Sequence, residues 1–547
     1  KNAKTLYRRI GLLGGGNIIM NFLTNLQYQE IATEKSSAKF YGIIIYKKNQ
    51  QGAKSVETLL YDIENDIIDF NELLGSFRII IKHAEDGIIF FGDNSNNCCF
   101  YYSVKEPDIS DTFLAACEKT SNKTIDYDSV AQFLQFGCIY GNDTMFREIK
   151  RTDSDCYYTV SEGIIYPHSK KLKSFGEITE YHTLDEFFNT TLDSLSGLKI
   201  ADVVTGGVDS RMVLSHLLRN DISPELFIAE EPDHIDVRIA AKISKIINSP
   251  LNVISKYYAS EDFLEDAFVA SDGVFAPCSR YTLVLMRREI KRKGFNVVFG
   301  GVCGELYKNS FINQDFPFYS GDKANIDKFY RIKIAPTVFP NFLCGKAMVN
   351  SFAETPSKVK SHLKTNLHDR KRSSYFNMGY WLMKQRIISI SNNACNTVPF
   401  MSPLLERNAL SIAFKINPYL LEMQSFARKE ISAHSRALAS IETDRGLTCR
   451  TGITPLISEC IANYIFMGRI MLNRCLRHNN TSNESNNSNY FVNKLRRSML
   501  INQCLDTCVK HDIVPNNVDI ATIPPQYLDR IFAVGMLLNY NGKCSQL

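Results

Sequence analysis

The segment from residue 198 to residue 311 constrains the fold most, because it alternates strand-like and helix-like patterns in short units. An apolar run at 198–204 is followed by a glycine pair and then by apolar residues at helical spacing over 212–218. Further strand-like runs stand at 226–229, 251–254 and 296–299, and a further helix pattern covers 236–248. Such alternation predicts a parallel sheet with crossover helices. We therefore expect an α/β domain here.

The sharpest local signal is the string T-G-G-V-D-S-R at 205–211, where the predicted strand turns into the predicted helix. Gly206 and Gly207 let the backbone approach an anion closely, and the N–H groups and dipole at a helix start attract negative charge. Thr205 and Ser210 add hydroxyl donors. The string is not a G-x-x-x-x-G-K-[ST] loop, because it has no lysine after the glycines. A second interpretation is a tight strand-to-helix turn with Asp209 as the helix cap.

The flanking parts of the chain have different patterns, and the length of 547 residues favours two or three domains. Up to about residue 166, short strand-like runs are separated by Gly, Asn and Asp clusters, which predicts a β-rich domain. These runs are 40–46, 77–82, 87–91 and 100–104. After the α/β segment the pattern is mainly helical, with a polar tract at 478–489 that is too poor in apolar residues to pack. We expect domains at 1–180, 181–460 and 461–547.

Composition narrows the class of protein. The formal net charge of +5 is small for this length, so the sequence predicts no nucleic-acid partner. The 15 cysteines are scattered without a C-x-x-C pair, which argues against structural zinc, and we interpret the pairs Cys98 with Cys99 and Cys504 with Cys508 as packed thiols. No apolar run is long enough to span a membrane and no signal peptide is present, so a cytoplasmic protein is expected.

Several segments, in order, carry a resemblance to a known family. The string at 205–210 resembles the S-G-G-x-D-S pyrophosphate loop of the N-type ATP pyrophosphatases, and the chain is most similar there to asparagine synthetase and its relatives. Asp236 and Ala240 stand as in the D-x-x-x-A segment of that family. G-G-V-C-G-E-L-Y at 300–307 resembles its G-x-G-x-D-E-[LV]-F loop, and T-V-P-F-M-S-P-L-L at 397–405 resembles its R-x-P-F-L-D segment.

Upstream, further strings resemble landmarks of the glutaminase domain of the same family: L-G-S-F at 74–77, Asp93 with F-Y-Y at 100–102, and D-T-M-F-R-E-I at 143–149. The resemblance implies a β-rich sandwich of the N-terminal-nucleophile type, followed by a parallel-sheet synthetase domain and a helical C-terminal part.

The resemblance also implies a reaction. ATP would be bound with Mg²⁺, a small-molecule or peptide carboxylate would attack its α-phosphate, and ammonia or an amine would attack the acyl-adenylate to give an amide and AMP. Catalysis of this kind is mostly positioning and stabilisation of charge on phosphate oxygens. The implied nucleotide-binding residues are Thr205, Gly206, Gly207, Asp209, Ser210 and Gly300; the implied metal ligands are Asp209 and Glu305; the implied catalytic residues are Glu305 and Arg445. A homodimer is compatible with the resemblance.

The sequence departs from the family at several of these positions. Gly304 stands where the family has an aspartate, and Gly301 stands where an acidic residue is common. Arg211 and Lys308 add positive charges, which we interpret either as contacts to an acidic substrate or as surface ion-pair partners. Arg445 lies where relatives have a lysine that stabilises the pentavalent phosphorus, although a simple loop explains its segment as well.

The largest departure concerns the glutaminase nucleophile. Such enzymes begin with a cysteine whose own amino group acts as its base. This chain opens with Lys1 and has no cysteine before Cys98, and its nearest match to the opening C-G-I is Y-G-I at 41–43. We expect a structural remnant without glutaminase activity.

Three hypotheses stay open. The first is an amide-forming enzyme that uses free ammonia or an amine. The second is a non-catalytic relative that binds a nucleotide or a partner. The third is a glutamine-hydrolysing asparagine synthetase whose first residues are missing from this chain.

Overall fold

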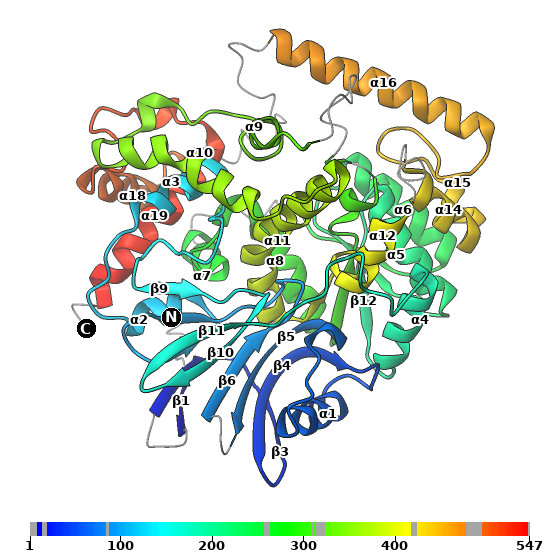
Figure 1. Ribbon diagram of the computed structural model, residues 1–547. Helices are drawn as coiled ribbons and strands as arrows, with labels where there is room; N and C mark the ends of the chain where they lie inside the picture. Colours follow the sequence, from blue (N-terminus) through cyan, green and yellow to red (C-terminus); the bar gives the residue numbers. More distant parts are fainter. Residues whose placement is uncertain are drawn as a thin grey trace.

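The computed structural model describes residues 8–13, 19–83, 87–255, 263–308, 310–311, 323–416, 424–476 and 495–544. It is an α/β structure with two β-sheets from the N-terminal part and a parallel sheet with helices further along the chain (Figure 1). The polar tract expected at 478–489 lies outside the described residues.

The N-terminal sheets pack face to face. One has the order β1-β2-β8-β7-β9 and the other the order β11-β10-β6-β5-β4-β3. Their shared core includes Phe22 and Ile109 from the first sheet and Ile80, Phe90 and Tyr158 from the second. The strands are β1 (Arg8–Leu13), β2 (Ile19–Thr24), β3 (Gln29–Ala32), β4 (Ser36–Tyr46), β5 (Leu73–His83), β6 (Gly87–Gly92), β7 (Tyr101–Ser103), β8 (Asp108–Ser110), β9 (Ile149–Arg151), β10 (Cys156–Ser161) and β11 (Ile164–Ser169).

Helices cover this sandwich on its outer faces. Helix α1 (Ala53–Glu64) buries Leu59 and Leu60 against Ile44 and Phe77 of the six-stranded sheet. Helices α2 (Phe113–Lys119) and α3 (Tyr127–Phe136) belong to another core on the side of the five-stranded sheet. All four strand-like runs predicted in this part of the chain are strands, because alternating burial on a two-layer core leaves a local pattern.

The third sheet has five parallel strands in the order β14-β13-β12-β15-β16. They are β12 (Ile200–Val203), β13 (Glu225–Ile228), β14 (Leu251–Val253), β15 (Val297–Gly300) and β16 (Phe400–Met401), and they are connected through α5 (Val208–Arg219), α6 (Ile235–Ile247), α7 (Phe263–Ser271), α8 (Pro277–Arg292) and later helices. The parallel sheet predicted from the sequence is confirmed. After β12 the chain adds β13 and β14 along one edge of that strand, and it later adds β15 and β16 along the other edge. The strand order therefore reverses between β12 and β15. Open α/β sheets bind ligands at such a reversal.

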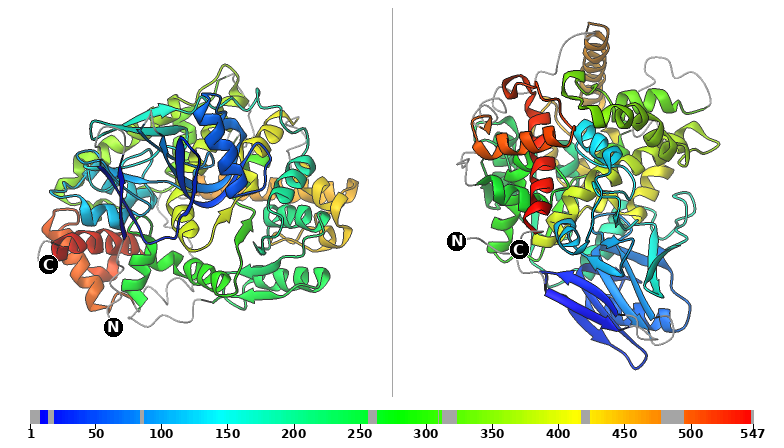
Figure 2. Two further views of the ribbon diagram at one scale, coloured as in Figure 1. Left: turned by 90° about the horizontal axis from the view of Figure 1, so that it is seen from below. Right: turned by 90° about the vertical axis from the view of Figure 1, so that its left-hand side faces the viewer.

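The C-terminal helices do not stand apart from the rest of the molecule. Helix α18 (Met499–Lys510) packs on α19 (Pro525–Cys544), and α19 contacts α3 and α8. Their buried side chains share one core with Leu134 and Phe268 from earlier parts of the chain. Figure 2 shows these red helices beside the body, with the blue strands of the sandwich at one end. Further helices are α4 (Leu184–Ser194), α10 (Val349–Lys364), α11 (Lys371–Thr397), α12 (Arg407–Lys415), α14 (Ser425–His434), the short α15 (Arg436–Ser440) and α16 (Ile453–Leu476).

The sandwich and the parallel sheet are joined by hydrogen bonds between buried residues. Ser76 donates its hydroxyl hydrogen bond to the carbonyl of Phe400 at 2.6 Å, and the Gly75 N–H donates to the Glu406 carboxyl group at 3.2 Å. Arg78 and Asp93 are wholly buried there. Burial raises the pKa of Glu406 to about 8, with a further contribution from the charge of Asp93.

Two expectations about side chains and helices can be compared with the described residues. The cysteines in the described part of the chain form no disulfide. Cys98, Cys99, Cys504 and Cys508 are buried, as expected for packed thiols. Among the helices described, none combines the length and apolar character needed to cross a bilayer.

Candidate functional site

The glycine string lies at the carboxyl end of the central strand. Strand β12 ends at Val203, residues 204–207 form the turn, and α5 begins at Val208 with Gly207 as its N-cap. The predicted position of this segment is therefore confirmed. Its first part is a loop and its last part, from Val208, is the first turn of the helix. The N–H groups of that turn point out of the helix at the edge where β12 and β15 end.

Two hydroxyl groups stabilise the loop from within. Ser210 accepts a hydrogen bond from the Thr205 N–H at 3.1 Å, and the two hydroxyl oxygens are 3.1 Å apart. The Gly207 N–H donates to the Thr205 hydroxyl oxygen at 3.2 Å. Ser210 is buried whereas Thr205 is exposed. Thr205 is thus the hydroxyl that an incoming ligand could reach.

Asp209 does not cap the helix. The N-cap is Gly207, without a side-chain capping bond, and the Asp209 carboxylate turns to Lys308, whose Nζ lies 2.6 Å from Oδ2. The other oxygen, Oδ1, is buried without a hydrogen-bond partner among the described residues. The capping interpretation is therefore wrong, because the side chain pairs with Lys308, in the loop after β15, and not with the N–H groups of its own helix.

Charges of both signs surround Asp209. Burial is the largest influence and raises the pKa of Asp209, whereas the Lys308 ammonium lowers it through charge and a hydrogen bond. The Glu305 carboxylate raises the pKa of Asp209 further, and the Arg445 guanidinium lowers it. Because these influences are electrostatic and fall off with distance, all three partners lie near Asp209. Four charged residues from three separate segments thus meet at the carboxyl edge of the sheet.

The loop after β15 lies directly on the first turn of α5. A Cβ atom at Gly304 would stand 2.0 Å from Cγ of Asp209, and one at Gly301 would stand 2.2 Å from the backbone nitrogen of Ser210. Neither position can carry a side chain in this arrangement. The two departures from the family pattern therefore occur where this chain brings two backbones together, and the aspartate expected at 304 would displace Asp209.

Arg211 has neither of the two roles expected from the sequence. Its side chain is fully buried, so it is neither a surface ion-pair partner nor exposed to a substrate. The guanidinium donates to the backbone carbonyl of Ile441 at 2.6 Å and to that of Glu442 at 3.2 Å, and makes a longer contact of 3.4 Å to that of Gly206. Arg211 therefore connects the glycine loop to the segment that carries Arg445.

That segment is a tight turn. The Thr443 N–H donates to the carbonyl of Leu447 and the Gly446 N–H donates to that of Thr443, at 2.8 and 2.9 Å. The Asp444 N–H donates to the Gly206 carbonyl at 3.2 Å. Arg445 is exposed at the tip of this turn. The turn and the glycine loop are thus joined by backbone contacts as well as by Arg211.

The glycines of the string have separate roles. A Cβ atom at Gly206 would lie 2.4 Å from Oδ1 of Asp236, so this glycine permits close packing against the start of α6. Gly207 has only the Thr205 hydroxyl within 3.4 Å of such an atom and offers the more open backbone. Gly300 is the last residue of β15, paired in register with Val203, and is buried. Gly300 therefore lies beside the end of β12, where the glycine loop begins.

The arrangement fits a magnesium-bound nucleotide. Mg²⁺ in phosphate sites is held by one or two carboxylates together with phosphate oxygens. Asp209 Oδ1 is a buried oxygen without a described partner, and Glu305 is an exposed carboxylate nearby. The helix start, Lys308 and Arg445 supply the positive potential that phosphates need.

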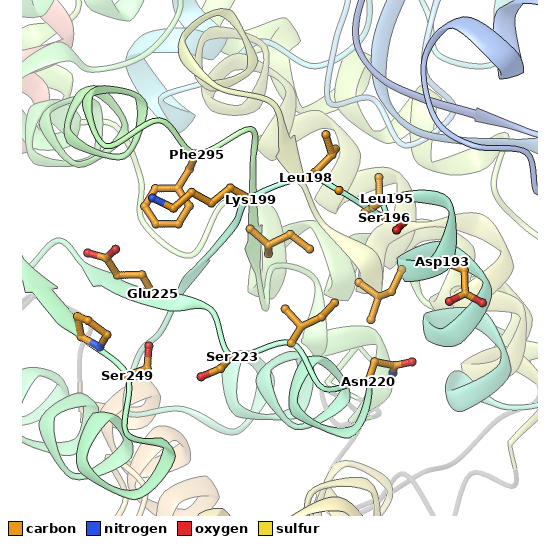
Figure 3. A pocket seen from close by; sticks show the side chains of 15 residues that line it. Asp193, Leu195, Ser196, Leu198, Lys199, Asn220, Ser223, Glu225, Ser249 and Phe295 are labelled. Carbon is orange, nitrogen blue, oxygen red and sulfur yellow. The ribbon is translucent and has the colours of Figure 1, made fainter.

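A separate pocket lies at the opposite edge of the sheet. Its volume is about 570 Å³, and its lining includes the starts of β12 and β13 and the residue before β14, at Ile200, Glu225 and Pro250. Figure 3 shows Lys199 and Glu225 among the side chains around it. Both are engaged: Lys199 donates to the Lys293 carbonyl, and Glu225 pairs with the Lys293 ammonium. The pocket has no convergent set of reactive groups and lies away from the candidate site.

Sequence reasoning missed two contacts of the site. The sequence showed Lys308 as an unusual positive charge but did not predict its ion pair with Asp209. It showed Asp236 as part of a D-x-x-x-A segment but did not predict its contact with Gly206. Comparison with known proteins gives no further guidance: a scan against protein-family models finds no match to this chain, and a search of curated proteins finds none either.

Proposed function

We propose that this chain is an asparagine synthetase-like ligase that uses ATP and Mg²⁺ to adenylate a carboxylate and passes the acyl group to ammonia or an amine. One observation carries the proposal. The glycine loop lies at the carboxyl end of β12, at the reversal of strand order, and it faces Glu305, Lys308 and Arg445. A phosphate-binding segment at this point of an α/β sheet is the usual arrangement for nucleotide sites.

The residues would act mainly by binding and orientation. The N–H groups at the start of α5 and the Thr205 hydroxyl donate to phosphate oxygens, and Asp209 and Glu305 hold the metal. Bound magnesium supplies positive charge to the phosphate oxygens. Lys308 and Arg445 add charge where pyrophosphate leaves the α-phosphorus. Fixed donors in a partly buried site stabilise such charge without reorganisation.

The first domain would be a glutaminase-like remnant of the N-terminal-nucleophile type. The supporting observation is the junction with the parallel sheet, where Arg78, Asp93 and Asn97 are wholly buried. Tyr41, in the middle of β4, uses its hydroxyl to donate to the Cys395 carbonyl at 2.9 Å. We therefore propose that the nitrogen comes from ammonia or an amine. We also propose a cytoplasmic location, because the described cysteines are free thiols.

A non-catalytic nucleotide-binding relative is the second candidate, and one observation favours it. Lys308 already pairs with Asp209, which reduces the negative charge left to hold a metal ion. In that case ATP would bind but no pyrophosphate would form.

The experiment measures pyrophosphate release from ATP with a panel of carboxylates, with and without ammonium or amines. Asp209→Asn is the test variant, and Asp193→Asn, on an exposed turn of α4 at the other edge of the sheet, is the control. We expect carboxylate-dependent release that falls about 100-fold or more in Asp209→Asn and stays unchanged in Asp193→Asn. ATP binding without release for any carboxylate would favour the second candidate. Equal activity in both variants would refute the assigned site.

A further inference from the structure

A cluster of two histidines and two carboxylates lies between three helices, away from the crevice described above. Asp185 comes from α4, His216 from α5, and Glu430 and His434 from α14. One ligand atom from each of the four side chains can be chosen so that all lie within 4.8 Å of one another. Glu430 and His434 are one helical turn apart, so both side chains lie on the same face of α14. The sequence pattern does not reveal this cluster, because its members are brought together only by the packing of the helices.

His216 is the centre of the cluster, and each of its ring nitrogens faces a carboxylate. It is fully buried, and its ring stacks on Phe188 at 4.2 Å between centroids, with 2° between the planes. Its Nδ1 lies 3.1 Å from Oδ1 of Asp185, and its Nε2 lies 3.3 Å from Oε2 of Glu430. Both contacts have ion-pair distances but poor hydrogen-bond angles, so the two ring nitrogens and Asp185 Oδ1 are buried without a well-formed hydrogen bond among the described residues. Buried polar atoms in this state are costly unless something else binds them.

His434 gives a second, independent indication. The Ser215 hydroxyl donates to the Met212 carbonyl at 2.8 Å, so its oxygen can accept from Nδ1 of His434, 3.2 Å away. A neutral ring with its proton on Nδ1 turns the lone pair of Nε2 toward Oδ1 of Asp185, at 3.0 Å. In that tautomer the lone pair and the carboxylate oxygen repel each other, and either a proton on Nε2 or a metal ion between the two atoms removes the repulsion.

We propose that Asp185, His216, Glu430 and His434 bind a divalent transition-metal ion, with zinc the best fit. Imidazole nitrogens and carboxylate oxygens are the zinc ligands found where thiolates are absent. A tetrahedral zinc ion spaces its ligand atoms by about 3.4 Å, so small side-chain movements close the cluster around it. Two carboxylates and two neutral rings balance the charge of the ion. Arg219 Nε, 3.3 Å from Asp185 Oδ2, and the Ser215 hydroxyl are the outer partners that orient two of the ligands.

The site is structural in character, because four protein ligands fill a tetrahedral ion and leave no open position. It joins α4 and α14 to α5, the helix that begins at the glycine loop. Asp185 and Glu430 are partly exposed, at 33% and 22% of their side-chain surface, which gives an ion a route in. The lack of paired cysteines argued against structural zinc, and the proposed site departs from that expectation because its ligands are imidazoles and carboxylates. The proposal does not depend on the proposed ligase activity.

The test is metal binding by the full chain, without an affinity tag. The protein is treated with a chelator, dialysed against ZnCl₂ and then against buffer, and its metal content is measured by mass spectrometry. We expect about one zinc per chain, a thermal midpoint that rises with zinc and falls with the chelator, and, with Co²⁺ in place of Zn²⁺, the visible absorption of a tetrahedral site.

Three variants assign the ion to the cluster. Glu430→Gln keeps the shape of a partly exposed side chain and is expected to fold, and His216→Ala removes the central ligand; both should reduce bound zinc at least about tenfold. His511→Ala, an exposed histidine at the end of α18, should leave zinc binding unchanged. Wild-type protein that holds no zinc and shows no zinc-dependent thermal shift would overturn the proposal and leave a cluster of ion pairs. Full zinc content in Glu430→Gln would equally overturn it.

Discussion

Replacing Arg211 by methionine tests whether the glycine loop and the Arg445 turn form one unit. Methionine keeps an unbranched side chain in the core but removes every hydrogen-bond donor. The guanidinium donates to the carbonyls of Ile441 and Glu442 within 3.2 Å. A hydrogen bond from a charged group contributes about 1.5–3 kcal/mol, and the carbonyls that remain are left without these donors. We expect the local free energy of opening of residues 438–449 to fall by about 3–5 kcal/mol.

Hydrogen exchange read by mass spectrometry measures this quantity in the peptide itself, which matters because a chain of this length need not unfold in one step. A loss of 3 kcal/mol corresponds to exchange about 100-fold faster. The matched control is Arg450→Met. Arg450 is exposed and bonds the Ser440 hydroxyl in the same segment at 2.9 and 3.0 Å, so its loss should change the free energy by less than about 0.5 kcal/mol. Equal exchange in the two variants would refute the structural role of Arg211.

Three further changes test the electrostatics. Lys308→Met should raise the pKa of Asp209, because the ammonium lowers it, and should shift the acidic limb of Mg·ATP binding to higher pH; an unshifted limb would contradict the pairing. Glu406 has a pKa of about 8 in the folded protein against 4.5 ordinarily, so its contribution to stability is lost as pH rises from 4.5 to 8. The loss is at most about 1.4 kcal/mol per pH unit. Glu406→Gln should therefore lessen the fall in the thermal unfolding midpoint between pH 6 and pH 8. Asp202→Val should raise the unfolding midpoint in urea by the equivalent of about 1–3 kcal/mol, because both carboxyl oxygens are buried without hydrogen-bond partners in the described part of the chain, and a lowered midpoint would show that they have one.

The architecture was predictable where it depends on local patterns. Buried strands, glycine turns and amphipathic helices each leave a signal within a few residues, so the run from β12 to β15 and the position of the glycine loop followed from the sequence. Asp202 shows the limit of that reasoning. It stands in a run that predicts an apolar buried strand, and the strand forms although the carboxyl group is buried in it; burial raises its pKa well above the usual value.

The contacts that define the site were not predictable, because they join residues far apart in the chain. The ion pair of Lys308 with Asp209 spans 99 positions. Arg211 was expected at the surface or at a substrate because arginine is usually exposed, and only the fold shows the carbonyl groups that surround it. The gathering of Asp185 and His216 with α14 likewise depends on helix packing, which a single sequence does not specify.

The binding of Mg·ATP measured by calorimetry tests the central claim most directly, because it needs no knowledge of the carboxylate or the amine. Wild-type protein should bind one ATP per chain in the presence of Mg²⁺. Asp209→Asn should weaken that binding about tenfold or more, since it removes the charge of a carboxylate whose Oδ1 is buried without a described partner, whereas Asp193→Asn should bind as the wild type does. Absence of binding in the wild type, or equal affinity in the two variants, would contradict a nucleotide site at the end of β12.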